Sequence, residues 1–556
     1  ASDVYKRQMQ EDTKGNFNIL SFTGLGLWNV YFIAKFALAH YEYLTLNFLY
    51  NGLLLLFILL PLKNRFLRLV RTGLALIAAI ALLYSESWLP GPDSIISNAQ
   101  NIAGFSAMYV AQLIVDFVNV KMVIWGIVIV LAYLLIKNWV RLTVFTLGYF
   151  ICLVLQPYYV AWTTKPAVEQ NVEVVAQNEP SQPQQETNAD PSAITSETID
   201  KWYTAFLDYE KGRRAEFPQG LSANDTPFEI ILMNICSLSN DDLLASDLMN
   251  HPVLSEFNIR FDHFNSATSY SGPATLRLLN AVCGQVNHDS LYDGRRPECE
   301  IMNRLDQLGY RQHLYLDHRG QYDNYLQTLR DKAGLMAPLE STAKYPVRYM
   351  AFDDEEISDD LAVLRDWQRK TSRDKETKRH VTLFNFIALH DGNRLPRHSR
   401  WEEFKPRAIR FLNDLQTFMH ELERSGRKVM LIVVPEHGAA VRGDRIQAPR
   451  LRDIPSMRIT EVPLMVKFFG IKNMPAEPIH VTGPTSYLAM STLIGRVLSL
   501  NYFGADGGSV PLEELVRDLP ETNPVSENGQ SVVLTYRGND YIRQKGGEWR
   551  PYPRER

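Results

Sequence analysis

Two adjacent residues that can bind a metal, Glu436 and His437, follow a short apolar run. This run, 429–434, comes after Gly426 and ends at Pro435, which is typical of a strand buried on both faces. In open α/β sheets, ligand sites lie beyond the carboxyl ends of the strands. A carboxylate next to an imidazole at that place suits zinc or a similar divalent ion. The alternative interpretation is a surface turn that carries an acid and a histidine by chance.

A third candidate ligand, Cys236, ends another apolar run, 228–235. Cys283 and Cys299 are sixteen positions apart in a loop-rich stretch. If this part of the chain is exported, as the membrane segments below indicate, an oxidising compartment favours a disulfide between them, with two free thiols as the alternative. Cys152 lies in a membrane segment, so Cys236 has no partner. We interpret Cys236 as a metal ligand, although burial alone would also explain it.

A candidate nucleophile, Ser271, precedes a predicted helix over 275–282. Pro273 suits the first turn of that helix, and Ser271 suits its cap. The amino end of a helix stabilises phosphate, and a serine there could attack phosphorus while a metal holds its alkoxide. A simple helix cap is the alternative. Other nearby hydroxyl groups compete for the role: Ser266, Thr268 and Ser269.

Three further residues could act on a phosphate. His390 follows the apolar run 383–389 and could bind phosphate or act as a general acid, although a structural histidine is equally consistent. Arg452 could clamp a phosphate oxygen, with a surface arginine as the default interpretation. His318 is a weaker candidate of the same type as His390.

The elements that would position these residues begin near Trp202, where apolar runs alternate with helical patterns. This alternation predicts an α/β domain, with a mostly parallel sheet and helices on both faces. A helix is predicted over 406–423 from the spacing of its apolar residues, and a β-hairpin over 532–536 and 541–543. The predicted strands are 228–235, 311–316, 347–352, 383–389, 429–434 and 464–469.

The first third of the chain is strongly apolar. It contains five hydrophobic segments close to the length that crosses roughly 30 Å of hydrocarbon, which predicts a helical membrane bundle. Lys35 lies inside the first segment, where it could reach the membrane surface or be buried. The segments are 20–39, 43–62, 70–87, 121–136 and 142–161.

Basic residues set the expected orientation of this bundle. Lysines and arginines gather between the second and third segments and between the fourth and fifth, so both loops should be cytoplasmic. The amino terminus is then cytoplasmic, and five crossings export the rest of the chain. The basic loop residues are Lys63, Arg65, Arg68, Arg71, Lys137 and Arg141.

Composition divides the rest of the chain. Residues 1–8 are interpreted as a non-native leader, because Met9 is a plausible initiator, and 9–162 as the transmembrane domain. The polar stretch 163–200 is interpreted as a flexible linker, and 201–556 as the exported domain. The net charge of −4 gives no indication of a nucleic-acid partner.

Taken together, these features resemble the membrane-anchored phosphoethanolamine transferases of the alkaline phosphatase superfamily, and most closely the subgroup that modifies bacterial cellulose. The resemblance extends from about Gly24 to the end of the chain. Its most specific stretches are 234–239, 264–274, 389–393 and 425–438.

The resemblance implies a zinc site held by Cys236, Ser271, Glu436 and His437. It implies that Ser271 is the nucleophile and carries phosphoethanolamine as a covalent intermediate. Three more residues would lie in the pocket: Tyr270, His390 and Arg452. More typical members of the superfamily use threonine as nucleophile, aspartate before the zinc-binding histidine and a carboxylate in place of Cys236. The departures at these points match the cellulose-modifying subgroup.

The resemblance also implies a cellular setting. The donor would be phosphatidylethanolamine and the acceptor cellulose. The glucose O6 hydroxyl is the expected point of attachment. The chain would be a multi-pass protein of the bacterial inner membrane with a periplasmic catalytic domain, next to other cellulose synthase and secretion subunits. One alternative is transfer of phosphoethanolamine or glycerol phosphate to lipid A or another envelope glycan. A structural subunit that docks the synthase is another, although four intact site residues argue against it.

Overall fold

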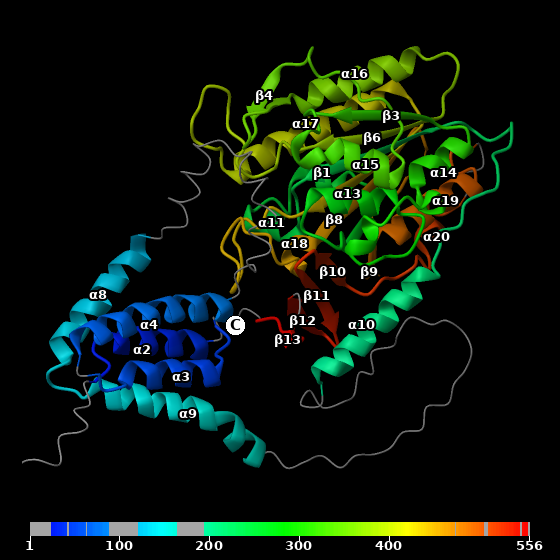
Figure 1. The fold of residues 1–556 in the computed structure, drawn as a ribbon. Coiled ribbons are helices and arrows are strands. Elements are labelled where there is room, and N and C mark those ends of the chain that lie inside the picture. Colours follow the sequence, from blue (N-terminus) through cyan, green and yellow to red (C-terminus); the bar gives the residue numbers. More distant parts are fainter. Residues whose placement is uncertain are drawn as a thin grey trace, which may run out of the picture. The chain divides into compact units, whose positions relative to one another are not determined.

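The computed structural model describes residues 24–41, 44–62, 64–87, 120–163, 194–472, 474–504, 510–544 and 547–553. These residues form two compact units, one within 24–163 and one from 194 onwards (Figure 1). The leader 1–8 and most of the predicted linker lie outside the described residues.

The first unit is helical. A helix lies in each of the five predicted hydrophobic segments: α2 (Trp28–His40), α3 (Phe48–Leu59), α4 (Arg65–Glu86), α8 (Val120–Ile136) and α9 (Leu142–Thr163). Within the described residues, only α4 is both long and apolar enough to cross a membrane. That all five helices cross a bilayer therefore stays a prediction.

A buried ion pair joins three helices of this unit. Lys35 of α2 lies 2.7 Å from Glu86 Oε2 at the end of α4, and it donates to Asn51 Oδ1 of α3 at 2.7 Å. Asn51 donates in turn to Glu86 Oε1. Lys35 is 2 % exposed and Glu86 is 3 % exposed, so Lys35 is buried and paired and does not reach the membrane surface.

The second unit is built on a seven-stranded sheet. Strands β3, β6, β1 and β7 are parallel neighbours, and β8 alone runs against both of its neighbours. The sheet is therefore mixed but mostly parallel, as predicted. In spatial order its strands are β3 (Arg311–Leu316), β6 (His380–Phe386), β1 (Glu229–Cys236), β7 (Val429–His437), β8 (Glu461–Phe469), β2 (Ile259–Asn265) and β9 (Ile479–Thr485).

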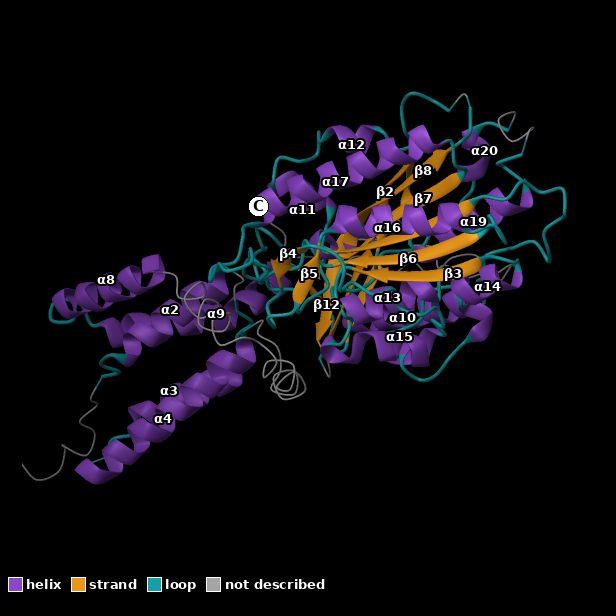
Figure 2. Ribbon diagram, turned by 90° about the horizontal axis from the view of Figure 1, so that it is seen from above, coloured by secondary structure: helices purple, strands orange, loops and turns teal. Residues whose placement is uncertain are grey.

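Helices cover both faces of this sheet (Figure 2). Along β1, Ile230 and Leu232 pack into one apolar cluster, and Ile231 and Met233 pack into the other. Because both faces are buried, the central strands read as continuous apolar runs. The first face is covered by α13 (Ser271–Leu279), α14 (Ile301–Gln307), α15 (Tyr325–Ala333), α19 (Tyr487–Ser499) and α20 (Leu512–Val516), and the second by α11 (Asn240–Ala245), α12 (Pro252–Ser255), α16 (Asp360–Arg373) and α17 (Phe404–Ser425).

Two strands of the sheet were not predicted, and one predicted strand lies elsewhere. β2 and β9 lie toward the sheet edge, where polar residues interrupt their patterns, so they lack the apolar runs of the centre. The predicted strand 347–352 is instead β4 (Val347–Met350), which pairs only with β5 (Glu356–Ser358) in a separate antiparallel ribbon. A short apolar run does not say which sheet a strand joins.

A smaller antiparallel sheet follows at the carboxyl end. The predicted hairpin is β11 (Ser531–Tyr536) and β12 (Asn539–Gln544), between β10 (Val525–Asn528) and β13 (Arg550–Pro551). Helix α10 (Ser196–Lys211) packs its aromatic residues on this sheet. The remaining short helices are α18 (Met457–Thr460), η2 (Asp289–Leu291), η3 (Pro297–Cys299) and η4 (Tyr322–Asn324).

Candidate metal centre

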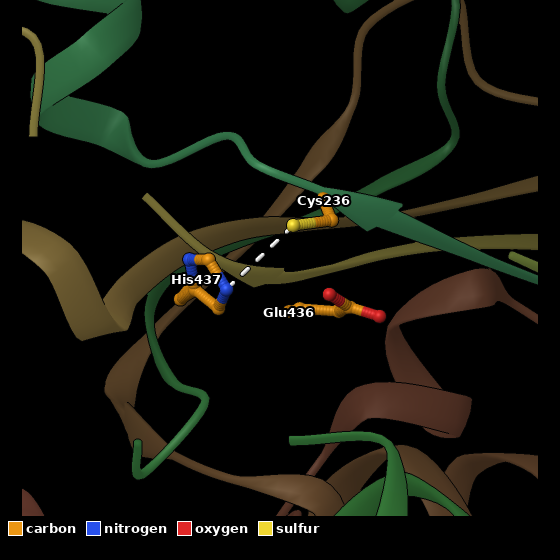
Figure 3. A group of neighbouring side chains, drawn as sticks. All are labelled: Cys236, Glu436 and His437. Carbon is orange, nitrogen blue, oxygen red and sulfur yellow. Dashed lines mark hydrogen bonds between the residues drawn. The ribbon is translucent and has the colours of Figure 1, made fainter. Parts of the chain in front are cut away.

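The three predicted ligands Cys236, Glu436 and His437 meet at the carboxyl ends of the neighbouring strands β1 and β7. One donor atom from each lies within 4.8 Å of the others, and all three side chains are buried. Figure 3 shows Cys236 and His437 turned toward each other, with Glu436 beside them. The structure therefore brings together three residues that are separated by up to 201 positions in the chain.

A strand irregularity lets two successive residues of β7 serve one site. Ile235 pairs with Pro435, but Cys236 pairs with His437, so Glu436 is an extra residue on β7. In a regular strand, adjacent side chains point to opposite faces of the sheet, and a bulge removes that alternation. The irregular register explains how both Glu436 and His437 reach the same centre.

Ser271 begins α13 and faces the same group. Its Oγ lies 3.2 Å from Cys236 Sγ and 3.4 Å from His437 Nε2. The predicted cap role for Ser271 is wrong, because Tyr270 is the N-cap residue and its side chain makes no capping hydrogen bond. The helix also begins four residues before the predicted start, with Pro273 in its first turn as expected. Because Ser271 does not cap the helix, its hydroxyl can take part in the metal centre.

The Glu436 carboxylate has one satisfied oxygen and one free oxygen. Its Oε1 accepts hydrogen bonds from four side chains: Asn234 at 2.8 Å, Asn385 at 2.6 Å, Thr275 at 3.1 Å and Tyr325 at 3.5 Å. Its Oε2 is buried and has no partner. A buried carboxylate oxygen without a partner is costly, so this atom fits a bound cation.

The four residues that donate to Glu436 were not predicted as site residues. Asn234 stands two positions before Cys236 on β1, and Asn385 lies opposite it in register on β6. Residues two apart on a strand share a face. A polar residue in an otherwise apolar strand, two positions from a candidate ligand, is the signal that could have found Asn234.

The protonation states of Cys236 and His437 also fit a cation site. His437 Nδ1 donates to Gly438 O at 2.9 Å, which leaves the lone pair of Nε2 on the side of Cys236. Burial, with the charge of Arg452, holds the pKa of His437 well below its usual range. Burial, followed by the charge of Glu436, raises the pKa of the Cys236 thiol to about 12. A bound cation would reverse this and favour the thiolate.

The donor set of this centre matches zinc. A thiol, an imidazole nitrogen, a carboxylate oxygen and the Ser271 hydroxyl make four donors of the types that zinc takes in tetrahedral sites. The Asn385 amide, which donates to Glu436, and the Gly438 carbonyl, which accepts from His437, are outer partners of the kind that such ligands usually have.

Arg452 and Tyr270 lie on loops beside the centre. Arg452 Nη1 donates to Ser237 Oγ at 3.2 Å, one residue beyond Cys236. The Tyr270 hydroxyl donates to Asp453 Oδ1 at 2.6 Å, and the Tyr270 side chain is 37 % exposed. Both predicted pocket residues are thus tied to one short segment at the open side of the centre.

His390 lies close enough to the centre for its charges to shift the His390 pKa, but it forms no hydrogen bond with the candidate ligands. Its ring packs against Phe352 with 4.8 Å between the ring centroids, and its Nδ1 donates to Asp391 O at 2.7 Å. Burial, then the charge of Arg452, lowers the pKa of His390 to about 3. The ring is therefore neutral at neutral pH, with Nε2 able to accept a proton.

His318 has the opposite electrostatic setting. Its Nδ1 lies 2.8 Å from Asp317 Oδ1, and it is almost fully buried. Burial lowers the pKa of His318, but the hydrogen bond and charge of Asp317 outweigh it, so the pKa is raised. Asp317 in turn accepts from the backbone N–H of Ile387, just before the loop of His390.

The predicted disulfide between Cys283 and Cys299 is present. It ties the segment after α13 to η3, so it supports the helix that carries Ser271. Cys236 is left as a free buried thiol, as the sequence analysis expected.

Comparisons with known proteins match almost the whole chain. Residues 28–155 match the family described as "Cellulose biosynthesis protein BcsG N-terminal domain", and residues 183–549 match "Cellulose biosynthesis protein BcsG C-terminal domain". The cellulose biosynthesis protein BcsG of Escherichia coli K12 is 40 % identical over 542 residues, which are 95 % of this chain and 96 % of that protein.

Two solved structures resemble the chain at much lower identity. Lipooligosaccharide phosphoethanolamine transferase A from Neisseria meningitidis is 12 % identical, with a TM-score of 0.42 over 84 % of this chain and 92 % of that one. The periplasmic domain of EptC from Escherichia coli, in complex with Zn, is 12 % identical, with a TM-score of 0.39 over 57 % of this chain and 93 % of that one.

Proposed function

Because this chain belongs to the family of the cellulose biosynthesis protein BcsG, we propose that it transfers phosphoethanolamine from phosphatidylethanolamine to glucose hydroxyls of cellulose, most simply at O6. The transfer proceeds through a covalent intermediate on Ser271. Family membership carries the link to cellulose, and the geometry of the centre carries the chemistry.

The observation that supports the chemistry is the position of the Ser271 hydroxyl. It lies at the amino end of α13, 3.2 Å from Cys236 Sγ, where a phosphate group and an anionic oxygen are both stabilised. A serine that only capped the helix would turn its hydroxyl toward the backbone of the first turn. Ser271 instead faces the candidate ligands.

Zinc is the cofactor we propose, held by Cys236, Glu436, His437 and Ser271. When bound, zinc lowers the pKa of a coordinated hydroxyl and offsets the charge of the phosphate. The chain's own contribution is to present a desolvated donor set, with the Glu436 carboxylate oriented by four hydrogen bonds.

In the first step, a bond forms between Ser271 Oγ and phosphorus, and the bond from phosphorus to the diacylglycerol oxygen breaks. In the second step, a glucose hydroxyl attacks the same phosphorus and releases Ser271. The proton of each attacking hydroxyl passes to the oxygen that leaves, so protons balance over the cycle, and His390 is assigned to carry it.

Arg452 and Tyr270 position the transferred group in this proposal. The Arg452 guanidinium, held beside Ser237, pairs with phosphate oxygens. Tyr270, partly exposed and bonded to Asp453, lies where a sugar would enter. Neither residue forms or breaks a bond in the proposed reaction, so each is assigned to substrate binding.

The membrane unit anchors this chemistry to its lipid donor. We propose that all five helices are embedded in the bacterial inner membrane, with the amino terminus cytoplasmic and the second unit periplasmic. The cellulose acceptor would come from neighbouring cellulose synthase and secretion subunits. The ion pair of Lys35 and Glu86 fits a bundle in apolar surroundings, because buried charges there need partners.

The test is the intact mass of the full-length chain in detergent, loaded with zinc and incubated with phosphatidylethanolamine. We expect a phosphoethanolamine adduct on the natural sequence and none on Ser271→Ala. Ser271→Thr is the matched control, because it keeps a hydroxyl at the first helical position and should keep the adduct. An adduct on Ser271→Ala, or none on the folded and zinc-loaded natural chain, would contradict the proposal.

The acceptor is tested separately, with the isolated adduct. Loss of the adduct on adding cellulose oligosaccharides, with phosphoethanolamine appearing on the sugar, supports cellulose as the acceptor. Loss of the adduct only with lipid A would favour the envelope-glycan alternative. An adduct that neither acceptor removes would contradict both acceptors, whereas a purely structural subunit would form no adduct at all.

A further inference from the structure

A second polar cavity lies in the same unit, between α13, the end of α10 and the start of α19. The cavity is small, with a volume of about 20 Å3 that would take one compact group, and it is partly open to solvent. Arg277 of α13, Tyr487 of α19 and Arg296, next to η3, line it together with Asn280 and Gln285. None of these residues belongs to the candidate metal centre.

The donors of this cavity are not satisfied by the protein. Arg277 is 5 % exposed, and its Nη1 donates to Val286 O at 2.8 Å, but its Nε and Nη2 are buried without an acceptor. The Tyr487 hydroxyl is likewise buried without a partner. The Nε and Nη2 groups form one edge of a guanidinium, which matches two oxygens of a single oxyanion.

Nearby carboxylates already have partners. Glu210 pairs with Arg213 and also accepts from the backbone N–H of Gln285 at 2.9 Å. Glu527 accepts from the Tyr203 hydroxyl at 2.8 Å and from the backbone N–H of His288 at 2.6 Å. The free edge of Arg277 therefore has positive charge without a hydrogen-bonded carboxylate.

Arg296 adds a second cation. It is half-buried, and burial, together with the charges of Arg214 and Arg277, lowers its pKa despite the opposing charge of Glu298. Two arginines therefore line one small cavity, and this arrangement favours an anion there.

The cavity also presents acceptors. Asn280 Oδ1 and Gln285 Oε1 are buried and have no donor. An anion that only accepts hydrogen bonds, such as sulfate, would satisfy the arginines and leave these two oxygens unpaired. A phosphate that carries a donor would satisfy more of these groups: the hydroxyl of inorganic phosphate can donate to one of the two oxygens, and the ammonium of phosphoethanolamine can donate to both.

We propose that this cavity is a second binding site, for a phosphate group that also carries a hydrogen-bond donor. Arg277, Arg296 and Tyr487 bind the phosphate oxygens, and Asn280 and Gln285 accept from the donor. The site goes beyond the proposed transfer reaction and does not depend on it.

The test uses the full-length chain in detergent with Cys236→Ala and His437→Ala, so that the metal centre no longer competes for phosphate. Isothermal titration at pH 7.5 compares inorganic phosphate, phosphoethanolamine and sulfate. We expect one site that prefers at least one of the two phosphates to sulfate by roughly tenfold or more, because sulfate strands two acceptors. The tighter of the two phosphates identifies the source of the ligand.

Variants then locate the site. Tyr487→Phe should weaken phosphate binding roughly 5- to 10-fold, and Arg296→Gln roughly tenfold or more. Arg296 is half-buried and Tyr487→Phe removes one oxygen, so both variants should fold even if Arg277→Gln does not. The proposal is overturned by no phosphate binding, by equal binding of sulfate, by affinities that neither variant changes, or by an experimental structure in phosphate that shows only ordered water in the cavity.

Discussion

Two buried polar clusters, one in each unit, differ in whether their desolvated charges have partners within the protein. In the membrane unit, Lys35 and Glu86 form an ion pair that Asn51 completes from a third helix. In the second unit, Glu436 keeps one oxygen without a partner, beside Cys236. The first cluster is closed and the second is open.

The difference separates a structural cluster from a functional one. Burying a closed cluster costs desolvation free energy. Its ion pair and hydrogen bonds offset that cost and join elements of the fold, here three helices. An open cluster bears the same desolvation cost but leaves one lone pair without a partner. Such a cluster is stable only if a ligand binds that lone pair. Polar burial alone would not distinguish the two, since both clusters are nearly fully buried.

The same substitution in both clusters should sharpen this contrast, with the largest effect at the open one. Glu436→Gln keeps the shape of the side chain but removes the charge that faces the metal. We expect the rate of adduct formation to fall at least about a hundredfold, with loss of bound zinc. Adduct mass and metal analysis measure this. Unfolding of the metal-free chain should not become easier, and a strong loss of metal-free stability would class Glu436 as structural.

The matching change at the closed cluster, Glu86→Gln, should act on stability. It leaves Lys35 buried and unpaired, which should cost about 3–5 kcal/mol of unfolding free energy in detergent. The double variant Lys35→Met with Glu86→Leu removes both charges and should regain most of that loss. If Glu86→Gln unfolds like the natural chain, the ion pair does not hold the bundle together.

A third polar pair, of one buried and one half-buried histidine, tests what happens when a charge is forced into the protein interior. His380 Nδ1 lies 3.0 Å from His313 Nε2 at the start of β6, and burial, then the charge of His313, lowers the pKa of His380 to about 4. The unfolded chain, with a pKa near 6.5, binds more protons between those values. Stability should therefore fall as pH decreases from about 6.5 to 4, by at most about 3 kcal/mol.

Denaturant unfolding across this pH range measures the effect of His380. His380→Gln cannot gain that proton and should flatten the acid side of the stability curve. An unchanged curve in His380→Gln would assign the acid dependence to other groups.

The smallest effect is expected one step away from the open cluster. Asn385→Ala removes one of four hydrogen bonds to Glu436 Oε1, so the carboxylate is less well oriented. Zinc affinity should weaken 10- to 100-fold in a chelator competition. Asn413→Ala, on the exposed side of α17, is the control and should leave affinity unchanged. Equal affinities in both variants would show that Asn385 does not orient the ligand.

Much of this architecture was readable along the chain. Central strands such as β1 and β7 were predicted because burial on both faces leaves an uninterrupted apolar run. Cys236, Glu436 and His437 were noticed because each stands at the end of such a run. The edge strand β9 and its neighbour β2 were missed, since a half-exposed strand carries polar residues and loses that pattern.

The sequence by itself determined which residue types stand at the ends of the central strands, and so the chemistry available there. Only the tertiary structure decided that a bulge in β7 brings Glu436 and His437 to one site, that Ser271 leaves the capping role, and that Lys35 is neutralised by Glu86. The physical reason is that strand identity depends on local burial patterns. Which lone pairs stay free depends on partners far away in the chain, and these meet only when the sheet and the bundle are assembled.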